Sequence, residues 1–382
     1  MPFETTFPRR AWVEIDLAAL ERNLGKIKAA LPGHVRYVAV VKADAYGHGM
    51  GQTVARFLQC GVDCFAVANV REGADVRELG SGADILVLGA TLPEEMPWLV
   101  EYDLTAALSS EAEAEALEEL GRKTGRRLPV HIKVDTGMGR MGVWHAAAGE
   151  LVARVLASEW LQLRGIFTHF SSADSDAEFT AEQRRLFLGV VELIPSRARE
   201  DLLIHADNSA GLETFAADGG FNAVRVGLLQ YGLPPRAGSL LERLHPEPVL
   251  SFYSRIGLVK NLPAGTSISY NRTCRLERDA RVAVVTAGYG DGVPISLSNR
   301  GQVLVRGKRC PILGRVTMDQ TVIDVTAVPE VAPGDVVTWI GSRDGATIAV
   351  GEFCAWSGNI PWEVFCSITK RVDRVYRTLR IQ

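Results

Sequence analysis

Lys42 is the first residue whose type and position together suggest chemistry. It ends the apolar run VRYVAVVK and precedes a turn of small and polar residues, within the stretch AVVKADAYGHG. An ammonium group at the end of an apolar strand costs several kcal/mol to bury unless a partner compensates for it. A lysine in a dry pocket also loses its proton more readily and becomes a nucleophile toward an aldehyde. The position of Lys42 therefore indicates either a covalent role or a role as a plain charge.

Polar side chains follow most of the other apolar runs in the first 235 residues. They are Asn69, Ser109, Lys133, Asp135, His169, Asp207, Asn208, Ser209 and Arg225. A single lysine or histidine in such a place is usually solvated or hydrogen-bonded without further function. The opposite ends of the same runs carry no comparable set, so the residues taken together predict a site where the runs end.

Eight short apolar runs, several of them separated by helical stretches, must position these side chains. They read VRYVAVVK, DCFAVAN, DILVLG, LTAALS, VHIKV, RGIFTHF, LLIHAD and AVRVG. None alternates between apolar and polar residues, which is typical of parallel strands buried on both faces. Eight such units predict a (β/α)8 barrel of the TIM type, with a doubly wound sheet as the alternative. Helices are expected after Asp16, at 110–120 and at 181–194.

Beyond residue 235 the pattern changes to β-rich runs broken by glycine, asparagine and proline. We therefore predict an α/β chain in which a (β/α)8 barrel at 13–238 is followed by a mostly-β C-terminal domain at 239–382. Residues 1–12 are expected to form an N-terminal segment that joins the β domain.

The turns after the seventh and eighth apolar runs are NSAG (208–211) and VGL (226–228). In a barrel these two turns commonly hold a phosphate, because small residues let backbone N–H groups approach it. An aldehyde with a phosphate tail is pyridoxal phosphate, and Lys42 would be its Schiff-base anchor. A sugar-phosphate enzyme that uses Lys42 only as a charge fits the spacing equally well.

The bulk properties exclude several other classes. A net charge of −3 gives no electrostatic reason to expect nucleic acid or an anionic membrane as a partner. No run approaches the length of a membrane span, and the first residues lack a signal-peptide pattern. The six cysteines show no CxxC spacing, so we expect reduced thiols and a cytoplasmic protein. His48, Asp135, His169 and His205 lack the HxH or HExxH spacing of a metal hydrolase, and no metal is expected.

Seven motifs spread along the whole chain resemble the alanine racemases. They are AVVKADAYGHG, HIKVDTGMGRMG, GIFTHFSSAD, HADNSAG, VRVGLLQYG, GYGDG and LGRVTMDQ. The resemblance implies a pyridoxal-phosphate barrel with a β domain, working as a head-to-tail homodimer whose active sites take residues from both subunits. It further implies an isomerase that interconverts L- and D-alanine and supplies D-alanine for peptidoglycan.

The resemblance also implies roles for individual residues. Lys42 would carry the cofactor and serve as one of two acid/base groups, and Tyr270 of the partner chain would be the other. Arg225 would contact the ring nitrogen, with His169 linked to it. Because arginine cannot accept that nitrogen's proton, the ring would remain a weak electron sink, which limits side reactions of a carbanion.

The remaining implied residues surround the cofactor and the substrate. Tyr46, Asn208, Ser209, Gly227, Leu228 and Trp362 would bind the cofactor, Arg140, Met318 and Asp319 the substrate, and Lys133 is a candidate for carbamylation. Two positions depart from the family pattern: Trp362 stands where a tyrosine is usual, and Ile295 where an arginine is common. The resemblance implies that these two positions bear on cofactor affinity and substrate entry.

Three other hypotheses use the same residues differently. They are a racemase of another amino acid such as serine, a pyridoxal-phosphate decarboxylase of the same two-domain plan, and a non-catalytic carrier of the cofactor. A carrier would have no use for a second proton donor such as Tyr270. A decarboxylase is expected to lack the KVDTGMGRMG and LGRVTMDQ motifs.

Overall fold

The computed structural model describes residues 7–214, 220–234 and 240–378. Its contacts divide the chain into two compact units. The barrel unit comprises Leu20–Ala45 and Met50–Glu247, and the β unit comprises the chain up to Ala19, Tyr46–Gly49 and the chain from Pro248 onward. The domain boundary expected between residues 238 and 239 lies outside the described residues.

The barrel unit is built on a parallel sheet of eight strands, and this confirms the predicted barrel. Their order is β10–β2–β3–β4–β5–β6–β8–β9, and each corresponds to one of the eight apolar runs. The bounds are β2 Arg36–Val40, β3 Cys64–Val67, β4 Asp84–Val87, β5 Thr105–Leu108, β6 Leu128–Asp135, β8 Leu161–Phe167, β9 Leu203–His205 and β10 Ala223–Val226. The backbone N–H of Asn222 donates to Ile204 and that of Arg225 to Asp207, so the first and last strands of this order meet. A doubly wound sheet, whose edges stay apart, is thereby excluded.

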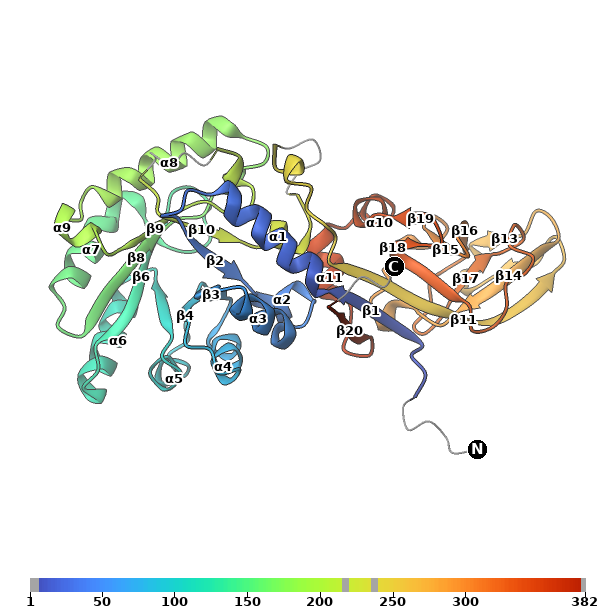
Figure 1. Cartoon of the computed structure of the whole chain (residues 1–382), viewed down its shortest axis with the longest axis horizontal. Coiled ribbons are helices and arrows are strands. Elements are labelled where there is room, and N and C mark those ends of the chain that lie inside the picture. The colour runs from blue at the N-terminus through green and yellow to red at the C-terminus, as the bar shows by residue number, and fades with distance from the viewer. Residues whose placement is uncertain (1–6, 215–219, 235–239, 379–382) are drawn as a thin grey trace. The chain divides into compact units, whose positions relative to one another are not determined.

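Helices lie outside the strands of this unit (Figure 1). They are α1 Leu17–Ala30, α3 Met50–Gln59, α4 Val70–Glu78, α5 Met96–Glu101, α6 Glu111–Thr124, α7 Ala148–Ala157, α8 Ala177–Val191 and α9 Ser196–Arg199. Asp16 caps α1 by accepting from the backbone N–H of Ala19 at 2.8 Å, as the sequence predicts. The helix predicted at 181–194 begins earlier, because Asp176 caps its first turn by accepting from Phe179.

The β unit contains a sheet of nine strands in the order β19–β18–β15–β16–β17–β14–β11–β1–β20. Their bounds are β1 Ala11–Asp16, β11 Leu250–Leu262, β14 Ala280–Val285, β15 Gln302–Val305, β16 Lys308–Leu313, β17 Thr321–Asp324, β18 Val336–Arg343, β19 Ala346–Ile348 and β20 Asp373–Arg377. The mostly-β character predicted for the C-terminal domain is confirmed. Strand β1 pairs with β11 and β20 as far as Asp16, so this sheet includes N-terminal residues beyond residue 12.

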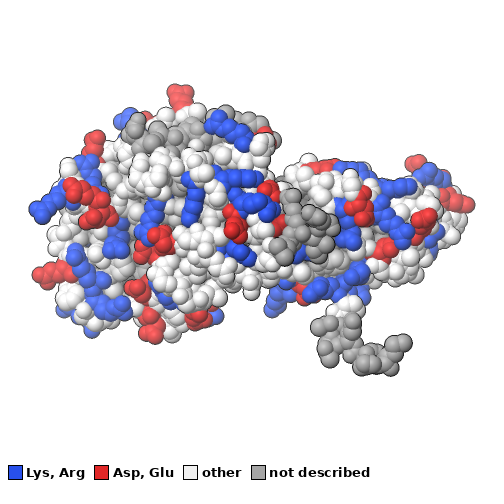
Figure 2. Space-filling model, viewed as in Figure 1, with Lys and Arg blue, Asp and Glu red and all other residues white. Residues whose placement is uncertain are grey.

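Two surface properties bear on the classes of partner. In the described ranges, no helix is long and apolar enough to cross a membrane. On the face shown in Figure 2, basic and acidic side chains are interspersed and no continuous basic area forms.

Candidate active site

Lys42 begins a left-handed turn directly after β2. The four residues that follow it, Ala43–Tyr46, have φ between 52° and 54°. Each L-residue in this conformation costs about 1–2 kcal/mol relative to a right-handed turn. Such a run persists only where surrounding contacts hold it, and strain of this kind concentrates at functional sites.

Glu72, in the first turn of α4, is one contact that holds this turn. Its Oε1 accepts from the backbone N–H of Ala43 and its Oε2 from that of Ala68, both at 2.8 Å. The backbone N–H of Glu72 in turn donates to Oδ1 of Asn69, the N-cap of the helix. Glu72 therefore connects the ends of β2 and β3 and limits the positions that Lys42 can adopt.

Arg225 is buried at the end of β10, the strand that pairs with β2. Its Nη2 donates to the carbonyl oxygens of Thr168 and Ala206 at 2.8 and 2.9 Å, and to Nδ1 of His169 at 3.2 Å. Its Nη1 donates to Nδ1 of His205 at 2.7 Å and to the carbonyl oxygen of the same residue. Both terminal nitrogens are thus in use, and Nε–H is the donor left for a ligand.

Charge and burial keep the two histidines beside Arg225 neutral. Burial, reinforced by the Arg225 charge, lowers the pKa of His169 and of His205 well below the usual value. Burial also lowers the pKa of Arg225 to about 10, which leaves it a cation near neutral pH. The cluster therefore presents a fixed positive donor that accepts no proton.

Lys133 lies buried in β6, with its Nζ 4.8 Å from the centre of the Phe167 ring. Burial is the main cause that lowers its pKa well below 10.5, and the charges of Arg225 and Arg140 add to the effect. Burial and the neighbouring cations therefore favour the neutral form of the amine, which is the nucleophilic form. Arg140, by contrast, is exposed.

The two small-residue turns meet through Ser209. Its Oγ accepts from the backbone N–H groups of Gly227 at 3.1 Å and Leu229 at 3.4 Å. Leu228 opens a short 3-10 helix, η3 (Leu228–Tyr231), where N–H groups of the first turn lack intrahelical partners. Asn208 instead forms hydrogen bonds within its own loop. Its Oδ1 accepts from the backbone N–H groups of Ala210 and Gly211.

Apart from Arg140, the predicted site residues that are exposed belong to the β unit. Tyr270 is 69% exposed and Met318 is 52% exposed. The residues on both sides of Tyr270, Ser269 and Asn271, have positive φ, so a tight turn presents its ring. Asp319 accepts from both terminal nitrogens of Arg371 at 2.9 Å.

The two departures from the family pattern also lie on the surface of the β unit. Trp362 is in the first turn of α11 (Pro361–Ser367) and is 37% exposed, while Ile295 begins a 3-10 turn and is 43% exposed. Tyr46 is half-buried at the end of the left-handed turn.

Sequence reasoning missed two residues of this site. Glu72 was identifiable, because Asn69 and Glu72 have the spacing of a capping box. For His205 the sequence suggests only a test as a metal ligand, because its hydrogen bond with Arg225 depends on tertiary contacts. Among the described residues no group of three or more His, Cys, Asp or Glu side chains could hold a metal ion.

Comparison with known proteins agrees with this geometry. Residues 15–235 match the model of the alanine racemase N-terminal domain, and residues 249–376 match that of the C-terminal domain. Alanine racemase of Halothermothrix orenii is 40% identical over 371 residues, covering 97% of each chain. That of Nostoc sp. is 40% identical over 377 residues, covering 97% of this chain and 96% of the relative.

Solved structures extend the likeness to three dimensions. Alanine racemase of Clostridium difficile 630 superposes with a TM-score of 0.90 at 30% identity, covering 98% of this chain and 97% of the other. The Bacillus anthracis alanine racemase with bound L-Ala-P gives 0.88 at 33% identity, with 99% and 97% covered. The chain belongs to the alanine racemase family of pyridoxal-phosphate-dependent isomerases.

Proposed function

We propose that this chain interconverts L- and D-alanine by moving the α-proton between two groups on opposite faces of the substrate, Lys42 and Tyr270. The observation that carries the proposal is the pairing of β2 with β10, because Lys42 follows β2 and Arg225 lies near the end of β10. Pyridoxal phosphate, when bound, draws electrons from the α-carbon and so makes the α-hydrogen acidic. Lys42 and Tyr270 then remove and return the proton.

The barrel residues fit the cofactor. Lys42 would hold its aldehyde covalently, and the unused Nε–H of Arg225 suits a ring nitrogen that accepts a hydrogen bond and stays unprotonated. Ser209 and the amides of Gly227 and Leu228 would hold the phosphate, because their turns already meet. Tyr46, His169, Asn208 and Trp362 complete the proposed cofactor contacts.

The second acid/base group is proposed to come from a partner chain in a head-to-tail homodimer. Tyr270 and Met318 are exposed on the β unit, where a partner's barrel could cover them. Arg140 and Met318 would contact the substrate, and Asp319 would lie near its carboxylate while paired with Arg371. We place the enzyme in the cytoplasm, consistent with six free cysteines in the described residues, and assign its D-alanine to peptidoglycan.

The function is tested by incubating the holoenzyme with L-alanine in D2O. We expect deuterium at Cα together with the appearance of D-alanine, because the proton on the returning group exchanges with solvent. Release of CO2 would indicate the decarboxylase instead, and inertness would indicate the carrier. Faster turnover of serine than of alanine would indicate a serine racemase. The altered entrance residues, Ile295 and Trp362, would then be the proposed cause of that preference.

Lys133 is expected to carry a carbamate. Burial lowers the pKa of the Lys133 amine and so favours its neutral form, which adds to CO2 and releases a proton. The product is an anion, which the positive charges of Arg140 and Arg225 would stabilise. A protonated Lys133 would instead be a third cation beside these two arginines. With ¹³C-bicarbonate, the ¹³C NMR spectrum of the wild type should contain a carbamate resonance that Lys133→Gln lacks.

The matched control for this measurement is Lys123→Gln. Lys123 is an exposed lysine that pairs with Glu119. This variant should keep the carbamate resonance. A wild-type spectrum without it at neutral pH would contradict the prediction.

A further inference from the structure

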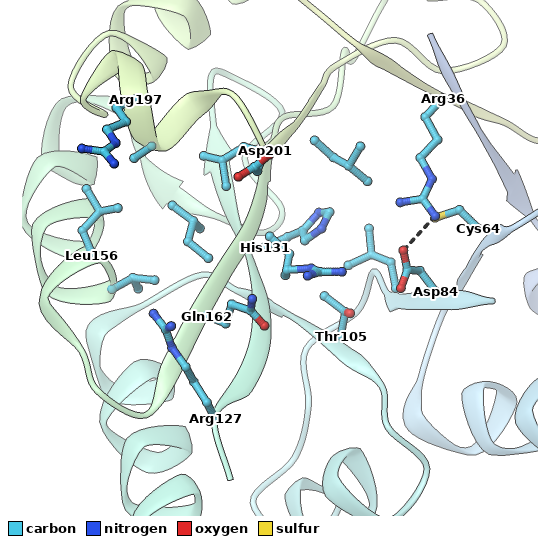
Figure 3. Close-up of a pocket in the computed structure, with 17 residues that line it drawn as sticks. Arg36, Cys64, Asp84, Thr105, Arg127, His131, Leu156, Gln162, Arg197 and Asp201 are labelled. Atoms are coloured by element: carbon cyan, nitrogen blue, oxygen red, sulfur yellow. Dashed lines mark ion pairs between the residues drawn. The ribbon is translucent and has the colours of Figure 1, made fainter. Parts of the chain in front are cut away.

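A cavity of about 540 Å³ lies within the barrel unit (Figure 3). Arg36, Cys64, Asp84 and Thr105 line it, and each is the first residue of its strand. Lys42, in contrast, follows the end of β2. The strand ends opposite to the proposed active site thus also carry polar side chains, and the expectation that they hold no comparable set is wrong. The volume is within the range of about 300–1,000 Å³ that is typical of small-molecule sites.

Arg36 contributes no free charge to this cavity. Its Nη2 lies 2.8 Å from Oδ2 of Asp84, the ion pair marked in Figure 3, and 3.3 Å from Oδ2 of Asp63. Among the lining residues, Asp84 therefore offsets the charge of Arg36, while Asp63 lies outside the lining.

Three further arginines line the cavity without such compensation. The Nε–H of Arg127 donates to the carbonyl oxygen of Leu161 at 2.9 Å, while its terminal nitrogens bind no other residue that the structure describes. The exposed side chains of Arg164 and Arg197 form no hydrogen bond or ion pair within the described ranges. Asp201 is the only other carboxylate among the lining residues described, and it too forms no ion pair there. The lining thus carries an excess of two positive charges.

His131 adds an uncharged donor among these side chains (Figure 3). Because Arg225 donates to Nδ1 of His205, the proton of His205 lies on Nε2 and is donated to Nδ1 of His131 at 3.1 Å. The proton of His131 is therefore on Nε2. Burial first, and then the Arg164 charge, lowers the pKa of His131 to about 3, so the ring is neutral.

We propose that this cavity binds a small dianion, either a phosphate or a dicarboxylate, through Arg127, Arg164 and Arg197, with His131 as a neutral donor. Guanidinium groups match the paired oxygens of both anions, and two negative charges balance the excess of the lining. The substrate is not this ligand, because alanine carries no net charge near neutral pH. The site is also separate from the proposed cofactor phosphate site, which lies at the opposite strand ends.

The test is calorimetric titration of the holoenzyme, in which the catalytic site already holds its cofactor. Inorganic phosphate at about pH 8 and succinate serve as separate probes, each against potassium chloride at equal ionic strength. We expect saturable binding with one anion per chain for at least one probe, and the stronger of the two identifies the class of ligand. The double variant Arg164→Gln/Arg197→Gln should weaken that binding about a hundredfold, roughly tenfold for each lost charged contact.

Arg199→Gln is the matched control. Arg199 is on the same short helix as Arg197, does not line the cavity and donates to Ser196. The control should bind like the wild type, and unchanged racemisation by all three proteins shows that they are folded. Absence of saturable heat with both probes, or equal affinity of the wild type and the double variant, overturns the proposal.

Discussion

Lys42→Ala is expected to abolish racemisation, with a loss of at least about 10⁴-fold, because the variant lacks both the covalent anchor and one acid/base group. The purified variant should also be colourless, whereas the wild type should absorb visible light through its lysine-linked cofactor. Borohydride treatment of the wild type should trap the cofactor on the peptide that contains Lys42. The measurements are an absorbance spectrum, peptide mass mapping and a racemisation assay.

Lys260→Ala controls for the removal of a lysine as such. Lys260 is exposed on β11, and its replacement should leave colour and rate unchanged. A borohydride-trapped cofactor on any other lysine would contradict the assignment. So would a Lys42→Ala variant that retains the visible absorbance of the wild type.

Tyr270→Phe is expected to reduce racemisation by about 10²–10⁴-fold while the cofactor remains bound. The substitution removes only the phenolic hydroxyl, so the proton on one face of the α-carbon loses its acceptor. Lys42 still acts on the other face. In D2O, one enantiomer of alanine should therefore continue to exchange its α-hydrogen although its mirror image no longer forms. NMR of each enantiomer, with chiral analysis of the product, measures both effects.

Tyr102→Phe is the control, because Tyr102 is in the barrel unit and bonds Glu78. Near-wild-type racemisation by Tyr270→Phe would show that the second group is another residue.

The same two variants also test the proposed homodimer. Unfolding and refolding a mixture of Lys42→Ala and Tyr270→Phe should restore about a quarter of wild-type activity, since half of the randomly formed dimers have one intact site of two. Each variant refolded alone should regain no more than about a hundredth of wild-type activity. Failure of the mixture to recover activity would contradict shared sites.

Local patterns in the sequence determined much of the fold. Eight apolar runs correspond to the eight strands of the barrel, because strands buried on both faces need unbroken apolar residues. The helix cap at Asp16 was likewise predictable, since it depends on residues only three apart. The polar residues at the strand ends could also be identified as a group, because parallel strands bring their carboxyl ends to one side of a barrel.

The tertiary structure alone decided how those residues affect one another. The left-handed conformation of Ala43–Tyr46 opposes local preference and depends on contacts such as that from Glu72, which is 29 residues from Ala43. Likewise, the lowered pKa of Lys133 results from burial and from the nearby charge of Arg225, and the pairing of β1 with β11 joins residues far apart in the chain. Periodicity and spacing describe a residue's near neighbours, whereas charge state, strain and cavity shape depend on contacts that form only when the whole chain has folded.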